Sequence, residues 1–288
     1  MLGVANATPF SFLKDVKLTS AKNIIERIDE GYEKNHKEKA RSYIGASIIG
    51  NQCDAMLAFN LRGFPNTPPD PRLLRIFGLG HILEDEIVRD LKNKAKIQVW
   101  EVDGLTGDQH TYEALGGHVV CHMDGHIDIG DNELRVLEIK TMNDASFSKF
   151  EKSGVKISHP QYYAQCQMMM GLSEIPTSFF IAVNKNNSKY HAQIIEFDEF
   201  EYAYIQERVG RIINNQAKKI SKDSADWRCK GCFKRGVCWE NKEVEKLCKT
   251  CQHSRASSGG DWHCVKHDKK AIDVCDSYSL YKPLDKEA

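Results

Sequence analysis

The stretch CHMDGHIDIGDNELRVLEIKT, residues 121–141, holds two acidic clusters separated by a glycine-centred turn. Apolar and polar residues alternate on both sides of the turn, which is the pattern of two antiparallel strands. If the turn is centred near Asp131, residues whose numbers sum to about 262 lie opposite one another. Asp124 then faces Glu138, and Lys140 shares their face because side chains two apart on a strand point the same way.

Two carboxylates at opposed positions of a strand pair lie roughly 5 Å apart at their β-carbons and repel each other unless a cation lies between them. A hard divalent ion such as magnesium or manganese takes carboxylate and carbonyl oxygens and fits there. A lysine beside such an ion stabilises developing negative charge, while the ion lowers the pKa of a bound water. Asp124, Glu138 and Lys140 therefore suit the hydrolysis of a phosphodiester bond.

A solvated hairpin with one cross-strand ion pair is the alternative explanation of the same residues. We favour the catalytic interpretation because Val136, Leu137 and Ile139 place the acid and the lysine in an apolar strand, where unpaired charges are costly. Asp128 lies on the same face as Asp124 and nearer the turn. It stays an alternative to Asp124, although the expected register favours Asp124.

Composition indicates a globular protein without a strongly basic surface. The 288 residues are 41% hydrophobic and 28% charged, with 40 basic against 40 acidic side chains. The chain can therefore bury a sizeable core but carries no global positive field. The first residues lack the pattern of a signal peptide, and no run approaches the roughly 18 apolar residues that span a bilayer. We expect a cytoplasmic protein without a membrane segment.

The order of the expected elements indicates an α/β (α+β) fold with a mixed central sheet flanked by helices. The expected helices span residues 21–42, 45–63, 72–96, 159–172 and 199–220, and the expected strands span 97–102, 118–128, 134–141, 177–185 and 188–198. Seven of the ten cysteines lie between residues 229 and 275. We therefore expect a core with N-terminal helices over residues 1–226 and a Cys-rich metal-binding segment over residues 227–288.

The helix expected at residues 72–96 carries a histidine outside its apolar stripe. His81 has Glu84 and Asp85 three and four positions later, so all three share one face. A local ion pair between His81 and Asp85 is the simplest explanation of that histidine taken alone.

Several motifs taken in order resemble the PD-(D/E)XK nuclease superfamily. FGLGHILEDE, then DG and VLEIKT, then HPQYYAQCQMMM follow the arrangement of the RecB-like exonucleases, which include the iron–sulfur CRISPR adaptation nucleases. GASIIGNQCDAMLAFNLRGF and FFIAVNKNNSKYHAQII resemble a phage-encoded nuclease of this kind, and the resemblance covers residues 42–238. It implies a restriction-endonuclease-like core that hydrolyses DNA with a divalent metal.

The resemblance also implies a role for each matching residue. His81 is the expected metal ligand on the helix, Asp124 and Glu138 are the carboxylate ligands, and the main-chain carbonyl of Ile139 completes the coordination. Lys140 is the expected catalytic lysine, which agrees with the chemistry inferred from the hairpin.

Two further residues, Gln165 and Met169, agree less well with the family's motifs. Gln165 falls on the family's catalytic glutamine, but Met169 replaces the tyrosine expected four residues later. That replacement puts a DNA-contacting or positioning role of residue 169 in question, and Gln165 could equally be a polar residue of an amphipathic helix. Glu84 could assist His81.

Three C-terminal cysteines, Cys229, Cys232 and Cys238, follow a C-x2-C-x5-C spacing that leaves a metal site one ligand short. In the iron–sulfur members of the group the fourth ligand lies far upstream, and Cys53 occupies that place here. The resemblance therefore implies a [4Fe–4S] cluster held by these four cysteines. The alternative is that Cys53 is a small buried hydrophobe and that the other three bind zinc with a later ligand.

A second group, Cys248, Cys251, Cys264 and Cys275, is a complete ligand set for structural zinc. A segment with so few aliphatic residues cannot build a core alone, which favours metal over free thiols. The residues that could replace one cysteine are His253, His263 and His267, and those that could touch DNA are Lys266, Lys269 and Lys270.

These features favour a metal-dependent DNA exonuclease that acts in phage recombination, replication or repair. DNA is the expected substrate, and a single-strand annealing or single-strand binding protein is the expected partner. The basic stretches KNKAK, NQAKKISK and CKGCFKR could line a DNA path. One alternative is a non-catalytic zinc-bearing DNA-binding or assembly protein on a nuclease-like fold, and another is an RNA hydrolase that uses the same residues.

Overall fold

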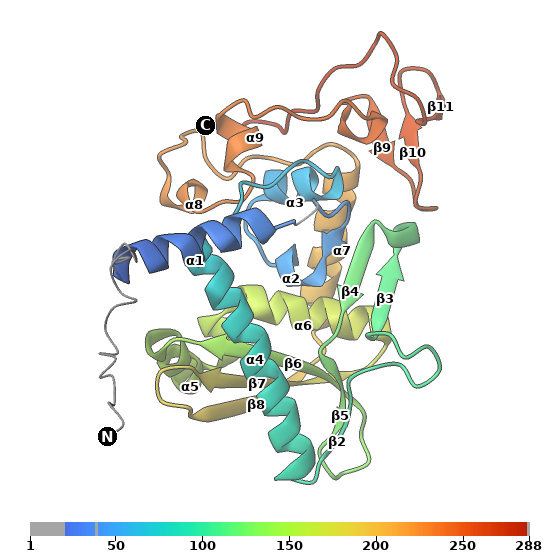
Figure 1. The fold of residues 1–288 in the computed structure, drawn as a ribbon. Coiled ribbons are helices and arrows are strands. Elements are labelled where there is room, and N and C mark those ends of the chain that lie inside the picture. Colours follow the sequence, from blue (N-terminus) through green and yellow to red (C-terminus); the bar gives the residue numbers. More distant parts are fainter. Residues whose placement is uncertain (1–20, 38–39, 287–288) are drawn as a thin grey trace, which may run out of the picture.

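A five-stranded mixed sheet forms the centre of the protein (Figure 1). The computed structural model describes residues 21–37 and 40–286. The sheet has the order β2-β5-β6-β7-β8, in which β6 and β7 are parallel and the other neighbours are antiparallel. Its strands are β2 (Gln98–Trp100), β5 (Gly125–Asp128), β6 (Arg135–Met142), β7 (Thr177–Asn184) and β8 (Tyr190–Glu196). The expected mixed sheet flanked by helices is confirmed.

Helices cover both faces of this sheet, and the alternation of side chains along β6 explains how. Leu137 and Ile139 belong to the apolar cluster beneath α4, whereas Val136 belongs to the larger core beneath α5 and α6. Helices α5 and α6 form the connection from β6 to β7, because two parallel neighbouring strands need a crossover connection. The helices are α4 (Pro71–Asn93), α5 (Asp144–Ser158), α6 (Pro160–Ser173) and α7 (Glu199–Ile213), which packs on α6.

A second sheet of three short strands, in the order β1-β4-β3, leads directly into β5. The strand expected at residues 118–128 is wrong as one unit, because β4 belongs to the small sheet and β5 to the large one. Gly125, with φ of +155°, lies at the change of direction, where a Cβ atom would be 2.7 Å from the Trp100 carbonyl oxygen. The small sheet consists of β1 (Ile44–Gly45), β3 (Thr111–Ala114) and β4 (Val119–His122).

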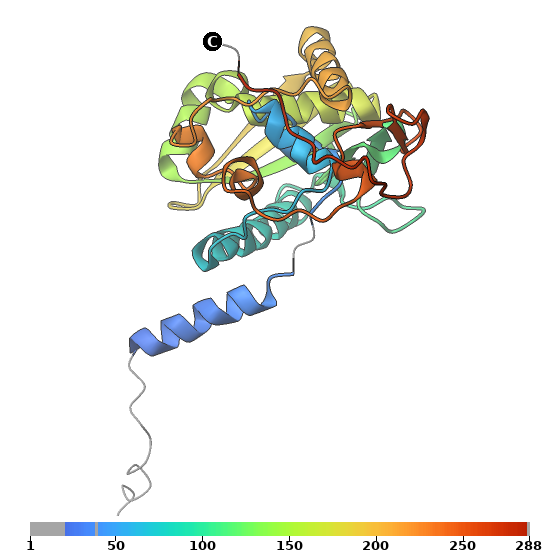
Figure 2. The same cartoon turned by 90° about the horizontal axis from the view of Figure 1, so that it is seen from above.

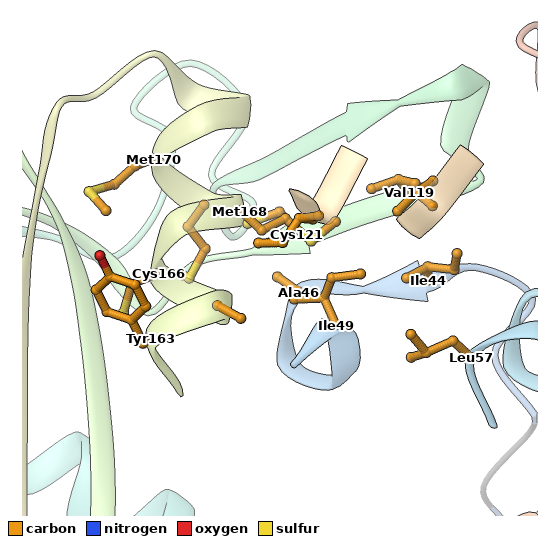
Figure 3. Packing of buried hydrophobic residues seen from close by; sticks show 14 of the residues in the cluster. Ile44, Ala46, Ile49, Leu57, Val119, Cys121, Tyr163, Cys166, Met168 and Met170 are labelled. Atoms are coloured by element: carbon orange, nitrogen blue, oxygen red, sulfur yellow. The ribbon is translucent and has the colours of Figure 1, made fainter. Parts of the chain in front are cut away.

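Buried side chains join the small sheet to α6 and to the N-terminal helices (Figure 3). Cys121 of β4 packs between Met168 and Ile49 in this core. The helix expected at residues 45–63 is interrupted, since α2 (Ala46–Ile49) and α3 (Asp54–Leu61) are separate. The chain at Gly50 passes so close to α6 that a Cβ atom there would lie 2.4 Å from the Gln161 Cα atom.

Helix α1 (Ala21–Asn35) lies beside α4 and away from the body of the protein (Figure 2). None of its residues is buried. An ion pair between Arg75 and Asp29 connects the two helices. The helix expected at residues 21–42 thus ends earlier, at Asn35, and forms a solvated flank of the protein.

The Cys-rich segment lies over α3 at one end of the molecule (Figure 1). It contains α8 (Trp227–Lys230), α9 (Arg235–Trp239), a 3-10 turn at Cys248–Thr250 and the sheet β11-β10-β9, formed by β9 (Ser254–Ala256), β10 (Trp262–Cys264) and β11 (Lys269–Lys270). Its last part returns to the core, since Tyr281 is buried there and Leu284 pairs with Ala217 and Lys219 through main-chain hydrogen bonds. Within the described residues, no helix is long and apolar enough to cross a membrane.

Candidate active site

The β5–β6 hairpin has the register expected from its sequence. Gly125 pairs with Leu137 and His126 with Val136, which places the next residue, Asp124, at the level of Glu138. Asp128 instead stabilises the turn of the hairpin. Its Oδ1 atom accepts hydrogen bonds from the amides of residues 130, 131 and 132. The structure therefore brings Asp124, rather than Asp128, to the Glu-x-Lys strand.

Asp124 lies at the break between the two sheets, and a main-chain hydrogen bond fixes its side chain. The amide of Ile139 donates to Asp124 Oδ2 over 2.7 Å. In the chain, Asp124 lies between β4 and β5. Its carboxylate reaches across the hairpin to β6, the strand that carries Glu138. The expected pair of carboxylates is thus adjacent, and the main chain of Ile139 lies between them.

Glu138 and Lys140 form an ion pair on the α6 face of β6. Glu138 is fully buried, and neither of its carboxylate oxygens has a hydrogen bond of normal geometry. Burial raises the pKa of Glu138 to about 7, against the opposing charge of Lys140, and the charge of Asp124 raises it further. Burial lowers the pKa of Lys140, but the carboxylates of Glu138 and Asp124 outweigh that effect and keep it above its ordinary value.

The arrangement fits a hard divalent cation. A buried carboxylate with unsatisfied oxygens beside a second carboxylate is stabilised by a cation that accepts oxygen ligands. In residues 21–37 and 40–286, no three His, Cys, Asp or Glu side chains already stand together as a metal-binding group. The fit therefore rests on Asp124, Glu138 and the nearby main chain of Ile139, completed by water as is usual for magnesium.

Glu84 of α4 is a further residue of this site. From the sequence, we expected Glu84 only as a neighbour of His81 and not as a neighbour of Asp124. Burial raises the pKa of Glu84 to about 8, followed by the charge of Asp124 and a hydrogen bond to that carboxyl group. A proton on Glu84 thus removes its repulsion with the Asp124 carboxylate. The signal in the sequence was helical spacing, since Glu84 follows His81 by three positions.

His81 lies further out than expected for a ligand. Its side chain is 82% exposed, and its Nδ1 atom lies 3.7 Å from Glu84 Oε2. The local partner is Glu84 and not Asp85, which the sequence suggested. The structure thus brings Glu84 to Asp124 and leaves His81 at the rim of the site.

Helix α6 supplies two residues behind the ion pair. Gln165 is buried and lies close enough to Glu138 to lower the pKa of that carboxyl group. The ring of Tyr162 lies 5.2 Å from Lys140 Nζ. Met169, at the position where the family has tyrosine, is fully buried in the core and has no access to a substrate.

The family comparison matches the segment that carries this geometry. Residues 77–176 match the model of the YqaJ-like viral recombinase domain. This part of the chain is therefore similar to the YqaJ-like viral recombinase domain family. The domain includes His81, Glu84, the β5–β6 hairpin and Gln165, and it is of the PD-(D/E)XK type. The resemblance to PD-(D/E)XK nucleases is confirmed.

Comparisons with known proteins outside the family model give weaker similarities. The crystal structure of the alkaline exonuclease LHK-Exo from Laribacter hongkongensis is 18% identical, with a TM-score of 0.41 over 66% of this chain and 91% of that chain. A phage-related exonuclease from Haemophilus somnus 129PT is 14% identical, with a TM-score of 0.42 over 62% of this chain and 93% of that chain. Similarity at this level does not establish a shared activity. No curated protein sequence matches the chain.

Outside the recombinase domain, the structure brings Cys53 near the three cysteines of the C-x2-C-x5-C motif. Cys229, Cys232 and Cys238 each lie close enough to Cys53 for its charge to raise their pKa. Burial is the larger cause in each case, and it raises the pKa of Cys238 to about 12. Arg208 of α7 anchors the turn that carries Cys53 by donating to the Ile49 carbonyl oxygen over 2.6 Å and by pairing with Asp54.

The second cysteine group also comes together. Cys248, Cys251, Cys264 and Cys275 line one cavity together with His253 and His267. Burial raises the pKa of Cys248, and the charges of the other three thiols raise it further. Of the lysines expected to touch DNA, Lys270 pairs with Asp261 over 2.8 Å.

The basic stretches expected to line a DNA path are partly used within the fold. Lys234 is 1% exposed, and its ammonium donates to the Phe64 carbonyl oxygen. Lys219 pairs with Asp285 over 3.0 Å and lies over the Trp239 ring. The expectation is therefore wrong for Lys234, because a buried ammonium cannot contact a phosphate.

Proposed function

We propose that this protein is a divalent-metal-dependent DNA exonuclease that acts in phage recombination, replication or repair. The observation that carries the proposal is the buried Glu138, whose carboxylate oxygens lack normal hydrogen bonds beside Asp124 and Lys140, inside a YqaJ-like viral recombinase domain. A solvated hairpin would leave its acid exposed and hydrated. Magnesium or manganese is the expected cation, since both take carboxylate oxygens.

Each residue of the site has a role in this proposal. Asp124, Glu138 and the carbonyl of Ile139 would hold the cation, and Glu84 would reach it once Glu84 has lost its own proton. When bound, the cation lowers the pKa of the attacking water and polarises the phosphate. Lys140 stabilises the negative charge that develops on the phosphate oxygens.

Two supporting roles complete the proposed site. Gln165 fixes the orientation of the Glu138 carboxylate from α6. His81 remains a proposed ligand at the rim, where its exposed ring can turn toward a cation held by Asp124.

The test is degradation of linear DNA by the purified full chain. The substrates are single- and double-stranded DNA, each with either the 5′ or the 3′ end blocked, with magnesium or manganese. Glu138→Ala should abolish cleavage and leave DNA binding intact. Asp124→Asn should reduce cleavage by at least about 100-fold, in the range lost with one electrostatic catalytic group, whereas Asp128→Asn serves as the matched control and should keep most of the activity.

The other outcomes identify the alternatives. Binding of DNA without cleavage by the wild-type chain in either metal would favour the non-catalytic assembly protein. Cleavage of RNA in preference to DNA would keep the site and change the substrate. A larger loss with Asp128→Asn than with Asp124→Asn would reassign the carboxylate ligand.

The cysteine groups support two further metal assignments within this proposal. Cys53, Cys229, Cys232 and Cys238 hold a [4Fe–4S] cluster, and Cys248, Cys251, Cys264 and Cys275 hold structural zinc. Both assignments rest on thiols of separate segments that lie near one another, and both suit a reducing cytoplasm. We place the core at residues 1–226 and the metal-binding segment at residues 227–288.

The proposed reaction also suggests a protein partner. An exonuclease that degrades one strand of a duplex exposes the other strand. A single-strand annealing or single-strand binding protein is therefore the expected partner.

A further inference from the structure

The second cysteine group lines a small cavity that is rich in metal donors. Its volume is about 30 Å³, more than the space that one water molecule needs. The donors that line it come from four separate places: the 3-10 turn and the residues after it, the end of β10, the turn that follows β10 and the loop at Cys275. Segments that are separate in the sequence therefore present metal donors to one cavity.

One pair of donors already has the spacing of ligands that share an ion. His267 Nε2 lies 3.6 Å from Cys275 Sγ. In a tetrahedral zinc site, bonds of about 2.3 Å to sulfur and about 2.0 Å to nitrogen place those two atoms about 3.6 Å apart. The observed separation thus matches one sulfur and one nitrogen on a common zinc ion.

The other two histidines of the segment have different surroundings. His263 forms an ion pair with Asp268 over 3.1 Å and does not line the cavity. His253 lines the cavity together with His267. His267 is the one whose ring contacts a thiol of the group in the described structure.

We propose that His267 is a fifth donor of the zinc site, beside Cys275, so that a four-coordinate ion has one ligand in reserve. The inference rests on the zinc assignment made for the second cysteine group. Cys275 is exposed whereas Cys251 is buried, so Cys275 is the ligand most open to solvent and oxidants. With His267 in reach, the loss of that thiolate leaves three thiolates and one imidazole, which is a common structural zinc set.

The side chains of the group line the cavity without converging as a finished metal site. The core holds the main chain on the Cys251 side of the cavity, because Arg62 donates to the carbonyl oxygens of Lys249, Cys251 and Ser254. Zinc binding therefore requires the thiols to move toward a common centre while this part of the main chain stays in place.

The experiment measures zinc per chain in the full-length protein, with iron counted separately. We expect one zinc in the wild type, in Cys275→Ser and in His267→Ala, and a loss of at least half of the zinc in the double variant. Cys275→Ser combined with His263→Ala is the matched control and should keep its zinc. The cobalt-substituted protein should change its visible absorption in Cys275→Ser, because nitrogen replaces sulfur at the ion.

Three results would overturn the inference. Loss of zinc in Cys275→Ser alone would show that His267 does not bind, and retention in the double variant would show that the reserve ligand lies elsewhere. Absence of zinc from the wild type would remove the site itself. None of these outcomes depends on nuclease activity, which the Glu138→Ala experiment tests independently.

Discussion

At the scale of single residues, the ring of Tyr162 on α6 positions the side chain of Lys140. Tyr162 lies beneath its ammonium, stacks on His159 with ring centroids 5.3 Å apart and contacts Phe180. Ser146 and Ser158 fix the His159 ring by hydrogen bonds of 2.6 and 2.8 Å. The ammonium is therefore positioned by a ring that cannot turn freely.

This arrangement predicts different effects for two substitutions of Tyr162. Tyr162→Leu removes the cation–π contact and should lower kcat by about tenfold with little change in KM, since such contacts are worth up to about 2 kcal/mol when desolvated. Tyr162→Phe keeps the ring and should stay within about twofold of the wild type. Steady-state cleavage of a labelled duplex measures both values, and equal rates for Leu and wild type would refute the positioning role.

We expect Glu84 and His81 to contribute differently to the affinity for the proposed cation. Glu84 hydrogen-bonds to Asp124, whereas His81 is largely exposed. We therefore expect Glu84→Ala to raise the manganese concentration for half-maximal activity by at least about tenfold, in the range of lost neighbouring groups of a metal site, and His81→Ala to raise it less. Manganese titrations of both variants, by activity and by direct binding, check this order. A larger shift for His81→Ala would restore the histidine as the principal helix ligand.

The sequence predicted the site residues that lie within the β5–β6 hairpin. It missed the residues that α4 and α6 bring to the site through tertiary packing. The pairing of Asp124 with Glu138 followed from a hairpin, whose register depends on the turn and the two-residue period. The position of Glu84 depends on how α4 crosses the sheet, and helical periodicity does not specify that crossing. The same limit explains Tyr162, because the approach of α6 to Lys140 is set by packing across the core.

At the scale of elements, Asp198 joins three helices. Its carboxylate caps α7 by accepting from the amides of Phe200 and Glu201, and it accepts from Lys156 Nζ over 2.8 Å and from the Tyr163 hydroxyl over 3.0 Å. The hydrogen bond from Lys156, followed by the amide of Glu201, lowers the pKa of Asp198 to about 2.

This lowered pKa predicts a pH-dependent effect of Asp198→Ala. Loss of the cap alone should lower the free energy of unfolding by about 1 kcal/mol near neutral pH. Because the folded pKa is lower than the unfolded value, the contribution is present above about pH 4 and disappears as the pH falls toward about 2. Denaturant unfolding of variant and wild type across that range measures the difference, and a difference independent of pH would contradict it.

The elements that the sequence missed share a physical reason. Helix α5 contains Gly154 in a left-handed conformation, which interrupts its helical signal, and β3 is only four residues long in a small sheet. The strand around Asp124 looked continuous because its polar and apolar residues alternate through the break. Long elements such as α4 and β6 were predicted because the apolar residues of α4 recur at helical spacing and those of β6 form a nearly continuous buried run.

At the scale of the whole molecule, Arg62 attaches the Cys-rich segment to the core. It is 1% exposed, donates to three carbonyl oxygens of the segment and lies over the rings of Tyr281 and Trp262. Arg62→Leu leaves those carbonyl groups buried without partners, at about 1–3 kcal/mol each. We expect faster proteolytic cleavage within residues 240–286, mapped by mass spectrometry, while Arg255→Leu, at a more exposed position, serves as the control. Unchanged cleavage would show that the segment is held by other contacts.

The first cysteine group connects two distant parts of the chain, because Cys53 at the start of α3 lies near three cysteines that follow α7. A [4Fe–4S] cluster there would close a loop of most of the protein and stabilise it chiefly through the lost entropy of the unfolded chain. Anaerobically purified protein should then be brown and absorb near about 400 nm, as thiolate-ligated iron–sulfur centres do. Cys53→Ser should lose the iron and lower Tm by several degrees, whereas Cys275→Ser should keep its colour. A colourless wild-type protein with two bound zinc ions would instead assign zinc to both cysteine groups.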